Sequence, residues 1–381
     1  MKNKFSGEQL KIARTYRGLT TEELAQKIGV KKQTISLYET DKIIPEVENL
    51  FKIIKELNFP RQFFFQNKKT IPAGTPYFRA LLTTNKKYRE QQKLQNQFRA
   101  QLCEYLLKYM DFPVLNIPNN IDFDGDIEAF SLKIREFWGL GLEPITNIIH
   151  LFEKQGLIVL LTKTDTDDID AFNQSIQIND EERYIVTLSK NKPSFSRIQF
   201  DAAHELGHIL LHPKSEDIEA ISREEFKFLE KQANEFAASF LLPKEAFIKD
   251  LPERYRYSLD YYVRLKKKWN VSISAMIIRA YNLNLMTYNQ YQYLMKKMSQ
   301  KGWKTHEPYD DSIIIPEPTM LKYAIDLLLD NNIHTVQSLL EDISVDLALN
   351  SDEIEFLLGL EKGKLAIPDT TISNIKPKLK V

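Results

Sequence analysis

Cysteine is almost absent from the sequence: Cys103 is the only one among 381 residues, so no disulfide can form within the chain. We expect Cys103 to be a small buried apolar residue. No apolar run approaches the roughly 20 residues of a membrane-spanning helix. Residues 1–18 also lack the apolar core of a signal peptide. These absences predict a cytoplasmic chain with no membrane partner.

Net charge is also absent, but the charges are unevenly distributed. Residues 1–110 contain 21 Lys and Arg against 10 Asp and Glu, whereas residues 111–381 contain 31 against 42. A basic first part and an acidic remainder favour one segment that meets a polyanion and another that does not. Charge alone leaves open the alternative that the basic residues only form a solvated face.

Hydrophobic periodicity and turn residues divide the chain into four segments. These are an all-helical segment, a basic helical connector, a mixed segment with a small sheet, and a helical C-terminal region, with boundaries 1–66, 67–112, 113–310 and 311–381. The connector includes a long basic helix from Asn85 to Met110. Two β-branched runs, at 157–161 and 184–189, predict strands in the mixed segment. The expected fold class is therefore α+β and mainly α.

The run FDAAHELGHILLHP places three histidines four residues apart. Residues i and i+4 lie on one face of a helix, so His204 and His208 can each direct a ring nitrogen at one metal ion. Glu205 then lies beside the ion, where a general base is needed, as in the H-E-x-x-H motif of zinc hydrolases. His212 lies about 12 Å along the helix from His204, too far for the same ion. We expect His212 at the helix end, which Pro213 terminates.

A third ligand must come from elsewhere in the chain. In EEFKFLEKQANEFAASFLLP, Glu230 shares a helix face with small residues, so we expect this face to pack on the histidine helix and to aim Glu230 at the ion. Glu225 or Glu235 is the alternative third ligand. Asn234, one turn after Glu230, can hold a ligand in place or serve as a packing amide. Two imidazoles and one carboxylate suit Zn²⁺, with Mn and Fe as alternatives.

These paired motifs resemble the ImmA/IrrE metallopeptidases, relatives of the thermolysin-type zincins. The likeness covers roughly residues 75–308 and includes IEAFSLKIREFWGLGLEPITNIIHLFEKQGLIVLL upstream of the histidines. It implies a zincin-like metallopeptidase domain with zinc at His204, His208 and Glu230. It also implies that Glu205 is catalytic and that a peptide bond is hydrolysed.

The residues that contact a substrate are less clearly marked. Tyr184 and His150 are candidates for a second donor to the oxyanion of the reaction. The run ERYIVTLS, residues 182–189, is either an edge strand that pairs with an extended substrate or an ordinary strand of the sheet.

The first 66 residues resemble the helix-turn-helix domain of the Cro/C1 (XRE) repressors, on the run RGLTTEELAQKIGVKKQTISLYETDKIIPEVENLFKI. Thr20 and Glu23 form a capping box. Ala25 is small where two helices cross, Gly29 permits the tight turn, and Ile35 anchors the second helix to the core. The residues expected to face double-stranded DNA are Thr21, which can meet a phosphate, and Lys32, Gln33, Thr34 and Ser36, which can reach base edges.

Together, the motifs and resemblances predict a transcription regulator that carries a zinc endopeptidase. The expected substrate is a protein, either a helix-turn-helix repressor or the chain itself, and the expected DNA-bound form is a homodimer on an operator. One alternative is a repressor whose zincin-like domain is a non-hydrolytic sensor. Another is the regulatory component of a toxin–antitoxin or phage system.

Overall fold

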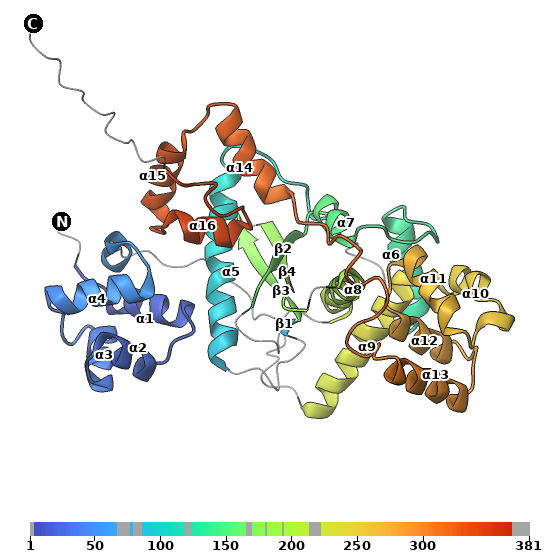
Figure 1. The fold of residues 1–381 in the computed structure, drawn as a ribbon. Coiled ribbons are helices and arrows are strands. Elements are labelled where there is room, and N and C mark those ends of the chain that lie inside the picture. The colour runs from blue at the N-terminus through green and yellow to red at the C-terminus, as the bar shows by residue number, and fades with distance from the viewer. Residues whose placement is uncertain are drawn as a thin grey trace, which may run out of the picture. The chain divides into compact units, whose positions relative to one another are not determined.

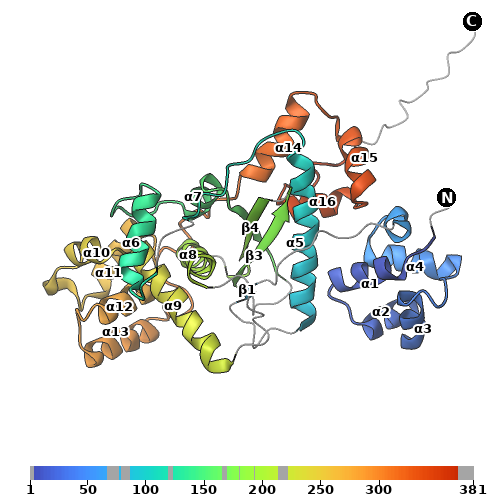
Figure 2. The same ribbon diagram turned by 180° about the vertical axis from the view of Figure 1, so that it is seen from behind.

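A computed structural model describes residues 4–66, 77–78, 86–118, 123–164, 170–179, 181–192, 194–212 and 222–367. The chain is mainly helical and has one small sheet, in agreement with the expected fold class (Figures 1 and 2). It divides into two compact units. Unit 1 contains the described residues of 1–70, 101–110 and 321–381. Unit 2 contains those of 71–100 and 111–320.

Unit 1 begins with four short helices and a 3-10 helix: α1 (Gly7–Tyr16), α2 (Thr21–Ile28), α3 (Lys32–Glu39), α4 (Val47–Leu57) and η1 (Arg61–Phe65). The capping box is confirmed, because the Thr20 hydroxyl accepts from the Glu23 amide and the Glu23 carboxylate accepts from the Thr20 amide. Gly29 ends α2 with φ +75°, a left-handed conformation that glycine adopts without strain. Ala25 and Ile35 are buried, as the sequence predicts.

The C-terminal helices of unit 1 are α14 (Met320–Asp330), α15 (Val336–Asp346) and α16 (Ser351–Leu358). Glu353 on α16 is buried, accepts a hydrogen bond from the Tyr16 hydroxyl and lies 2.6 Å from Arg17 Nη2. Asn58, which follows α4, donates to Asp352 at 3.0 Å. Helix α16 is thus joined to the end of α1 by the buried carboxylate of Glu353, and to the end of α4 by the exposed hydrogen bond between Asn58 and Asp352.

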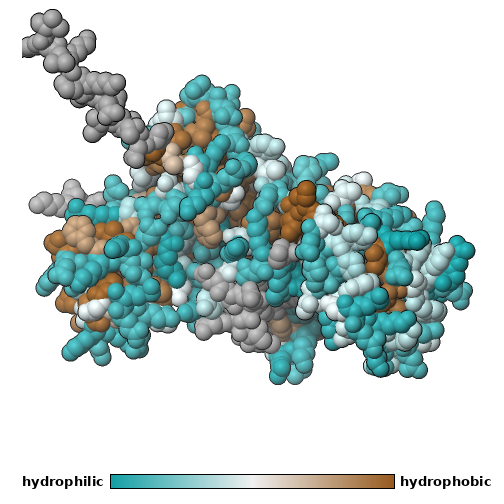
Figure 3. Space-filling model, viewed as in Figure 1, coloured by the Kyte–Doolittle hydropathy of each residue, from teal (hydrophilic) through white to brown (hydrophobic). Residues whose placement is uncertain are grey.

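Unit 1 exposes several large apolar side chains close together in sequence. Leu37 lies on α3, Ile43 and Ile44 follow that helix, and Val47 and Phe51 lie on α4, where Phe51 is 65% exposed. The space-filling view shows an apolar patch over these N-terminal helices (Figure 3). Patches of this kind on an otherwise polar surface mark contact sites.

The sheet of unit 2 has the order β1-β3-β4-β2. Its strands are β1 (Tyr77–Phe78), β2 (Ile158–Thr162), β3 (Ala171–Ile178) and β4 (Glu181–Ser189). β2 and β4 confirm the two predicted strands. The edge-strand interpretation of residues 182–189 is wrong, because β4 pairs with β3 on one side and with β2 on the other. A strand with neighbours on both sides has no unpaired backbone to offer a substrate.

The helices of unit 2 pack partly on the sheet and partly on one another. They are α6 (Ile127–Phe137), α7 (Ile148–Lys154), α8 (Phe195–Leu211), α9 (Arg223–Leu241), α10 (Lys244–Asp250), η2 (Glu253–Tyr255), α11 (Leu259–Trp269), α12 (Ile273–Asn282) and α13 (Tyr288–Gln300). In both ribbon views α8 lies beside the sheet, and α9 crosses α8 (Figures 1 and 2). The core joins apolar side chains of β2, β4, α8 and α9 with those of α11 and α12.

The long basic helix expected from Asn85 to Met110 is α5 (Lys86–Leu106), whose residues are shared between the two units. Asn85 lies outside the described residues. Cys103 on α5 is buried, as expected for a small apolar residue. No helix in the described part of the chain is both long and apolar enough to cross a membrane.

Candidate metal centre and DNA-binding surface

Helix α8 carries the histidine motif through the interior of unit 2. His204, Glu205 and His208 are all buried, although each is polar. The helix ends at Leu211, and the backbone N–H of His212 donates to the carbonyl oxygen of His208. His212 therefore lies at the helix end, as the sequence predicts, while Pro213 lies outside the described residues. Buried imidazoles and carboxylates need partners, which the neighbouring elements supply.

The close crossing of α8 and α9 depends on two small residues. A Cβ added at Gly207 would lie 3.1 Å from the Cα of Ala233, so any larger side chain there would press the helices apart. Ala233 and Ala237 are buried on the face that meets α8. This confirms the prediction that the small-residue face of the second motif packs on the histidine helix.

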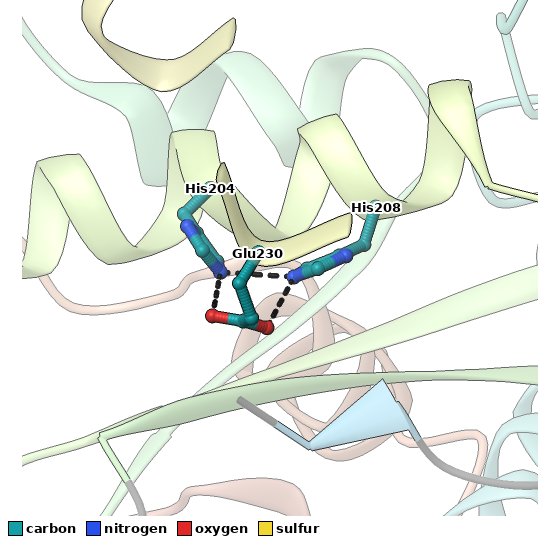
Figure 4. Close-up of side chains that lie close together, drawn as sticks. All are labelled: His204, His208 and Glu230. Atoms are coloured by element: carbon teal, nitrogen blue, oxygen red, sulfur yellow. Dashed lines mark hydrogen bonds and ion pairs between the residues drawn. The ribbon is translucent and has the colours of Figure 1, made fainter. Parts of the chain in front are cut away.

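The crossing brings three potential metal ligands together. His204 and His208 project from α8 toward Glu230 on α9 (Figure 4). Their Nε2 atoms lie 2.9 Å apart. The Glu230 carboxylate oxygens lie 3.5 Å from Nε2 of His204 and 3.2 Å from Nε2 of His208.

The two alternative carboxylates lie elsewhere on α9. Glu225 is exposed in the first turn, where its backbone N–H donates to the Ser222 side chain. Glu235 is 3.7 Å from Lys231 on a solvent-facing part of the helix. Among the described residues, the cluster of possible metal ligands contains only His204, His208 and Glu230.

The spacing of these atoms fits a zinc ion. Tetrahedral zinc with bonds of 2.0–2.1 Å separates its ligand atoms by about 3.3 Å. The distances between the ligand atoms, 2.9 to 3.5 Å, are close to this value. Two imidazoles and one carboxylate also form a donor set typical of catalytic zinc, which keeps a further position for water. The residues present therefore fit the metal that the sequence motif implies.

Burial and contacts within the cluster set the protonation of His208 and Glu230. Burial lowers the pKa of His208 well below the usual range of an imidazole. Burial raises the pKa of Glu230, but hydrogen bonds from His204 and His208 outweigh it and lower the pKa to about 2. His208 is therefore neutral and Glu230 ionised near neutral pH, and these are the forms that bind a cation.

Each histidine of the cluster is held through its second ring nitrogen. His204 Nδ1 lies 3.2 Å from Oδ1 of Asn234, whose Nδ2 donates to the Glu230 carbonyl oxygen at 2.7 Å. His208 Nδ1 lies 2.8 Å from Nδ1 of His212. Burial lowers the pKa of His212 to about 4, so His212 is neutral and its Nδ1 can accept a hydrogen bond. Once an ion takes the place of the contacts between Nε2 and Glu230, these partners favour the tautomers that keep the proton on Nδ1 and leave the Nε2 lone pair for the ion.

Asn173 on β3 contacts the expected general base. Its Nδ2 donates to Oε2 of Glu205 at 2.8 Å, and both side chains are buried. Neither Asn173 nor strand β3 was predicted from the sequence. The signal was the alternation of AFNQSIQI, in which Phe172, Ile176 and Ile178 share one face. That alternation predicts a strand, although it does not reveal which helix the strand meets.

The two candidate oxyanion donors, Tyr184 and His150, lie on β4 and α7. Tyr184 is buried in the core, and its hydroxyl donates to Glu182 at 3.3 Å. His150 is exposed on α7. A role of either side chain as an oxyanion donor stays a prediction from the sequence.

The N-terminal helices of unit 1 present the expected DNA-facing residues on α2 and α3. Lys32, Gln33 and Ser36 are exposed on α3, and Thr34 is half-buried beside them. Thr21 begins α2 and is half-buried. Lys32 Nζ lies 3.4 Å from Glu22, an exposed contact that DNA can displace. A short helix with polar side chains at its exposed N-terminal end is the reading element of helix-turn-helix proteins.

Fold and site together define a chain with a helix-turn-helix element and a peptidase-like domain. Residues 10–64 match the family model described as helix-turn-helix, and residues 152–281 match the model described as IrrE N-terminal-like domain. The chain thus contains an XRE-type helix-turn-helix segment and a segment of the ImmA/IrrE peptidase family, which confirms both resemblances. A comparison with the curated proteins found no match.

Proposed function

We propose that the chain is a cytoplasmic DNA-binding transcription regulator with a zinc-dependent endopeptidase. The observation that supports the peptidase best is the convergence of His204, His208 and Glu230 from two helices, with Glu205 next to His204 in the sequence and hydrogen-bonded to Asn173. In this proposal the helix-turn-helix domain is 1–66, the connector 67–112, the peptidase domain 113–310 and the helical C-terminal region 311–381.

The proposed chemistry assigns each residue of the cluster a task. His204, His208 and Glu230 hold the ion, and His212 and Asn234 orient the two imidazoles. When bound, zinc polarises the scissile carbonyl and lowers the pKa of the attacking water. The Glu205 carboxylate takes a proton from that water and passes it to the leaving nitrogen. Asn173 keeps Glu205 in the orientation that this transfer needs.

We propose a protein substrate, either a helix-turn-helix repressor or the chain itself. We expect cleavage that stops with a chelator and returns with added zinc, because all three ligand side chains serve one ion. The measurement is mass spectrometry of the purified chain, incubated alone and with candidate repressors, with and without chelator. Products that form equally well in chelator would contradict the metallopeptidase proposal.

A second candidate function is a non-hydrolytic sensor that changes DNA affinity when a peptide binds. Its support is that the helix-turn-helix segment and the peptidase-family segment belong to one chain, so a peptide bound to the second can change the DNA affinity of the first. The sensor predicts peptide-dependent DNA affinity with no new peptide ends. The peptidase predicts new ends in the same incubation. The third alternative, a regulator of a toxin–antitoxin or phage system, is tested by the genes that neighbour this one.

For DNA binding, we expect two different effects from substitutions on α3. Lys32→Ala removes a positive charge and a side chain that can reach guanine, so it should weaken binding to all sequences, reduce the salt dependence and relax the preference for guanine at one position. Gln33→Ala removes a bidentate donor–acceptor and should cost about 1–3 kcal/mol at one base pair. Gel shifts on DNA selected from a random library by the wild-type protein measure both effects.

Lys55→Ala is the matched control, since Lys55 is an exposed cation of the same domain on α4. If Lys55→Ala weakens binding as much as Lys32→Ala, α3 is not the reading helix. The same titration on palindromic and half-site DNA tests the proposed homodimer. The apolar patch of Leu37, Ile43, Ile44, Val47 and Phe51 is our candidate for its contact, because it adjoins the helix that must face each half-site.

A further inference from the structure

Strand β3 has a short neighbour on the side away from β4. In the sheet order β1-β3-β4-β2, the described strands that flank β3 are β4 and β1. The two residues of β1 pair antiparallel with β3, with Tyr77 opposite Asn173 and Phe78 opposite Phe172. Without β1 this side of β3 would be a sheet edge, whose backbone N–H and C=O groups can pair with another extended chain. β1 therefore occupies a place where a polypeptide strand can dock.

The part of β3 that pairs with β1 is also the part that meets the expected general base. Asn173 donates to Oε2 of Glu205 at 2.8 Å, and Glu205 follows His204 on α8. Neighbouring strands lie about 4.8 Å apart, so the backbone of Tyr77 is about one strand spacing from that of Asn173. In Figure 4 the light-blue arrow of β1 lies below α8, on the side toward which both imidazoles project. A chain that pairs with β3 at Asn173 is thus brought beside Glu205.

The attachment of β1 to β3 is slight. Two paired residues exchange few backbone hydrogen bonds, and each adds little net free energy because water offers the same groups other partners. Pro76, the residue before Tyr77, has no backbone N–H to donate. The other side of β3, in contrast, pairs with β4 over the whole length Ala171–Ile178. β1 can therefore leave while the pairing of β3 with β4 keeps the sheet intact.

We propose that β1 occludes the docking edge of the peptidase, and that an extended segment of the polypeptide substrate binds antiparallel to β3 in its place. This inference rests on the proposed peptidase function, because Glu205 is taken as the general base beside that edge. β1 belongs to the connector 67–112, so the connector competes with the substrate within one molecule. The apparent affinity for a substrate then falls in proportion to the fraction of molecules whose edge is open.

The first test measures binding apart from cleavage, in the zinc-loaded Glu205→Gln variant of the full chain. The probe is a fluorescein-labelled peptide with the sequence of residues 74–82, GTPYFRALL. A second peptide, with proline in place of its tyrosine and phenylalanine, lacks two backbone donors and should bind at least about tenfold more weakly. Fluorescence anisotropy gives both affinities.

Removing the strand from the chain should open the edge. Adding Tyr77→Pro and Phe78→Pro to the Glu205→Gln chain deletes two backbone donors of β1, and we expect it to bind the probe about tenfold or more tightly than the parent. Thr83→Pro with Thr84→Pro is the matched control, since it puts two prolines into the same connector outside β1. It should bind the probe like the parent, and circular dichroism checks the fold of each variant.

Locking the strand in place should have the opposite effect. Directly opposed residues of antiparallel strands have Cα atoms about 4.5–5.5 Å apart, within the range that a disulfide spans. Phe78→Cys with Phe172→Cys can therefore be cross-linked, and Cys103, the one native cysteine, is buried. We expect the oxidised protein to bind the probe at least about tenfold more weakly than the same protein after reduction. The reduced form and the two single variants are the controls.

Three outcomes would overturn the inference. They are a probe affinity that the prolines at 77 and 78 do not raise, equal binding by the oxidised and reduced forms, and equal binding of the proline-containing peptide and the probe. The proposed function fails separately. A chain whose β1 variants shift peptide affinity as expected but which cleaves no peptide refutes the peptidase and keeps the occluded edge. A chain that cleaves peptides at a rate indifferent to the state of β1 does the reverse.

Discussion

Replacing Glu205 with glutamine is expected to lower the rate of peptide cleavage about a thousandfold or more. The amide keeps the volume of the carboxylate, and its oxygen can still accept from Nδ2 of Asn173. It cannot take a proton from water, however. Because neither the three ligand side chains nor α3 is changed, metal content and DNA affinity should stay at the wild-type level.

The measurement uses a peptide library digested by the wild-type chain and by Glu205→Gln, with new peptide ends counted by mass spectrometry. Glu225→Gln is the matched control, because it changes an exposed carboxylate of α9 that neither joins the metal cluster nor lines the cavity beside Glu230. Cleavage by Glu205→Gln at the wild-type rate would remove Glu205 from the chemistry and, with it, the proposed mechanism.

Asn173→Ala distinguishes positioning from direct participation. The substitution removes the donor that holds Oε2 of Glu205 but leaves the carboxylate in place. We expect kcat to fall about 10- to 100-fold with KM little changed, the range seen when a supporting hydrogen bond is lost. An equal rise in KM without loss of kcat would show that Asn173 contacts the substrate instead.

Removing the Glu230 carboxylate is expected to lower zinc affinity by more than about a hundredfold. In Glu230→Ala only two imidazole nitrogens, 2.9 Å apart, remain of the three-residue cluster. His208 is neutral by virtue of its burial, so the loss of the carboxylate does not leave an unpaired positive charge in the interior. The protein should therefore remain folded while the metal is lost.

Competition with a coloured chelator gives the zinc affinity, and circular dichroism checks the fold. Glu225→Ala and Glu235→Ala are matched controls on the same helix and should bind zinc like the wild type. The result would count against the proposed ligand set if either control lost the metal while Glu230→Ala kept it.

Much of the site was predictable because its determinants are local. The four-residue spacing of His204 and His208 puts both on one face of any helix, whatever surrounds it. The capping box of Thr20 and Glu23 and the left-handed Gly29 likewise follow from neighbouring residues. For the same reason, the sequence alone suffices to predict the helix-turn-helix element, the histidine helix and the strands β2 and β4.

Long-range packing decided the rest. Glu225, Glu230 and Glu235 are chemically alike, and only the crossing at Gly207 and Ala233 brings Glu230 to the histidines. The interior position of β4, and the contact of Asn173 with Glu205, depend on strand neighbours far apart in sequence. Local periodicity identifies the elements and their faces, whereas the choice of which faces meet depends on shape and burial across the whole unit.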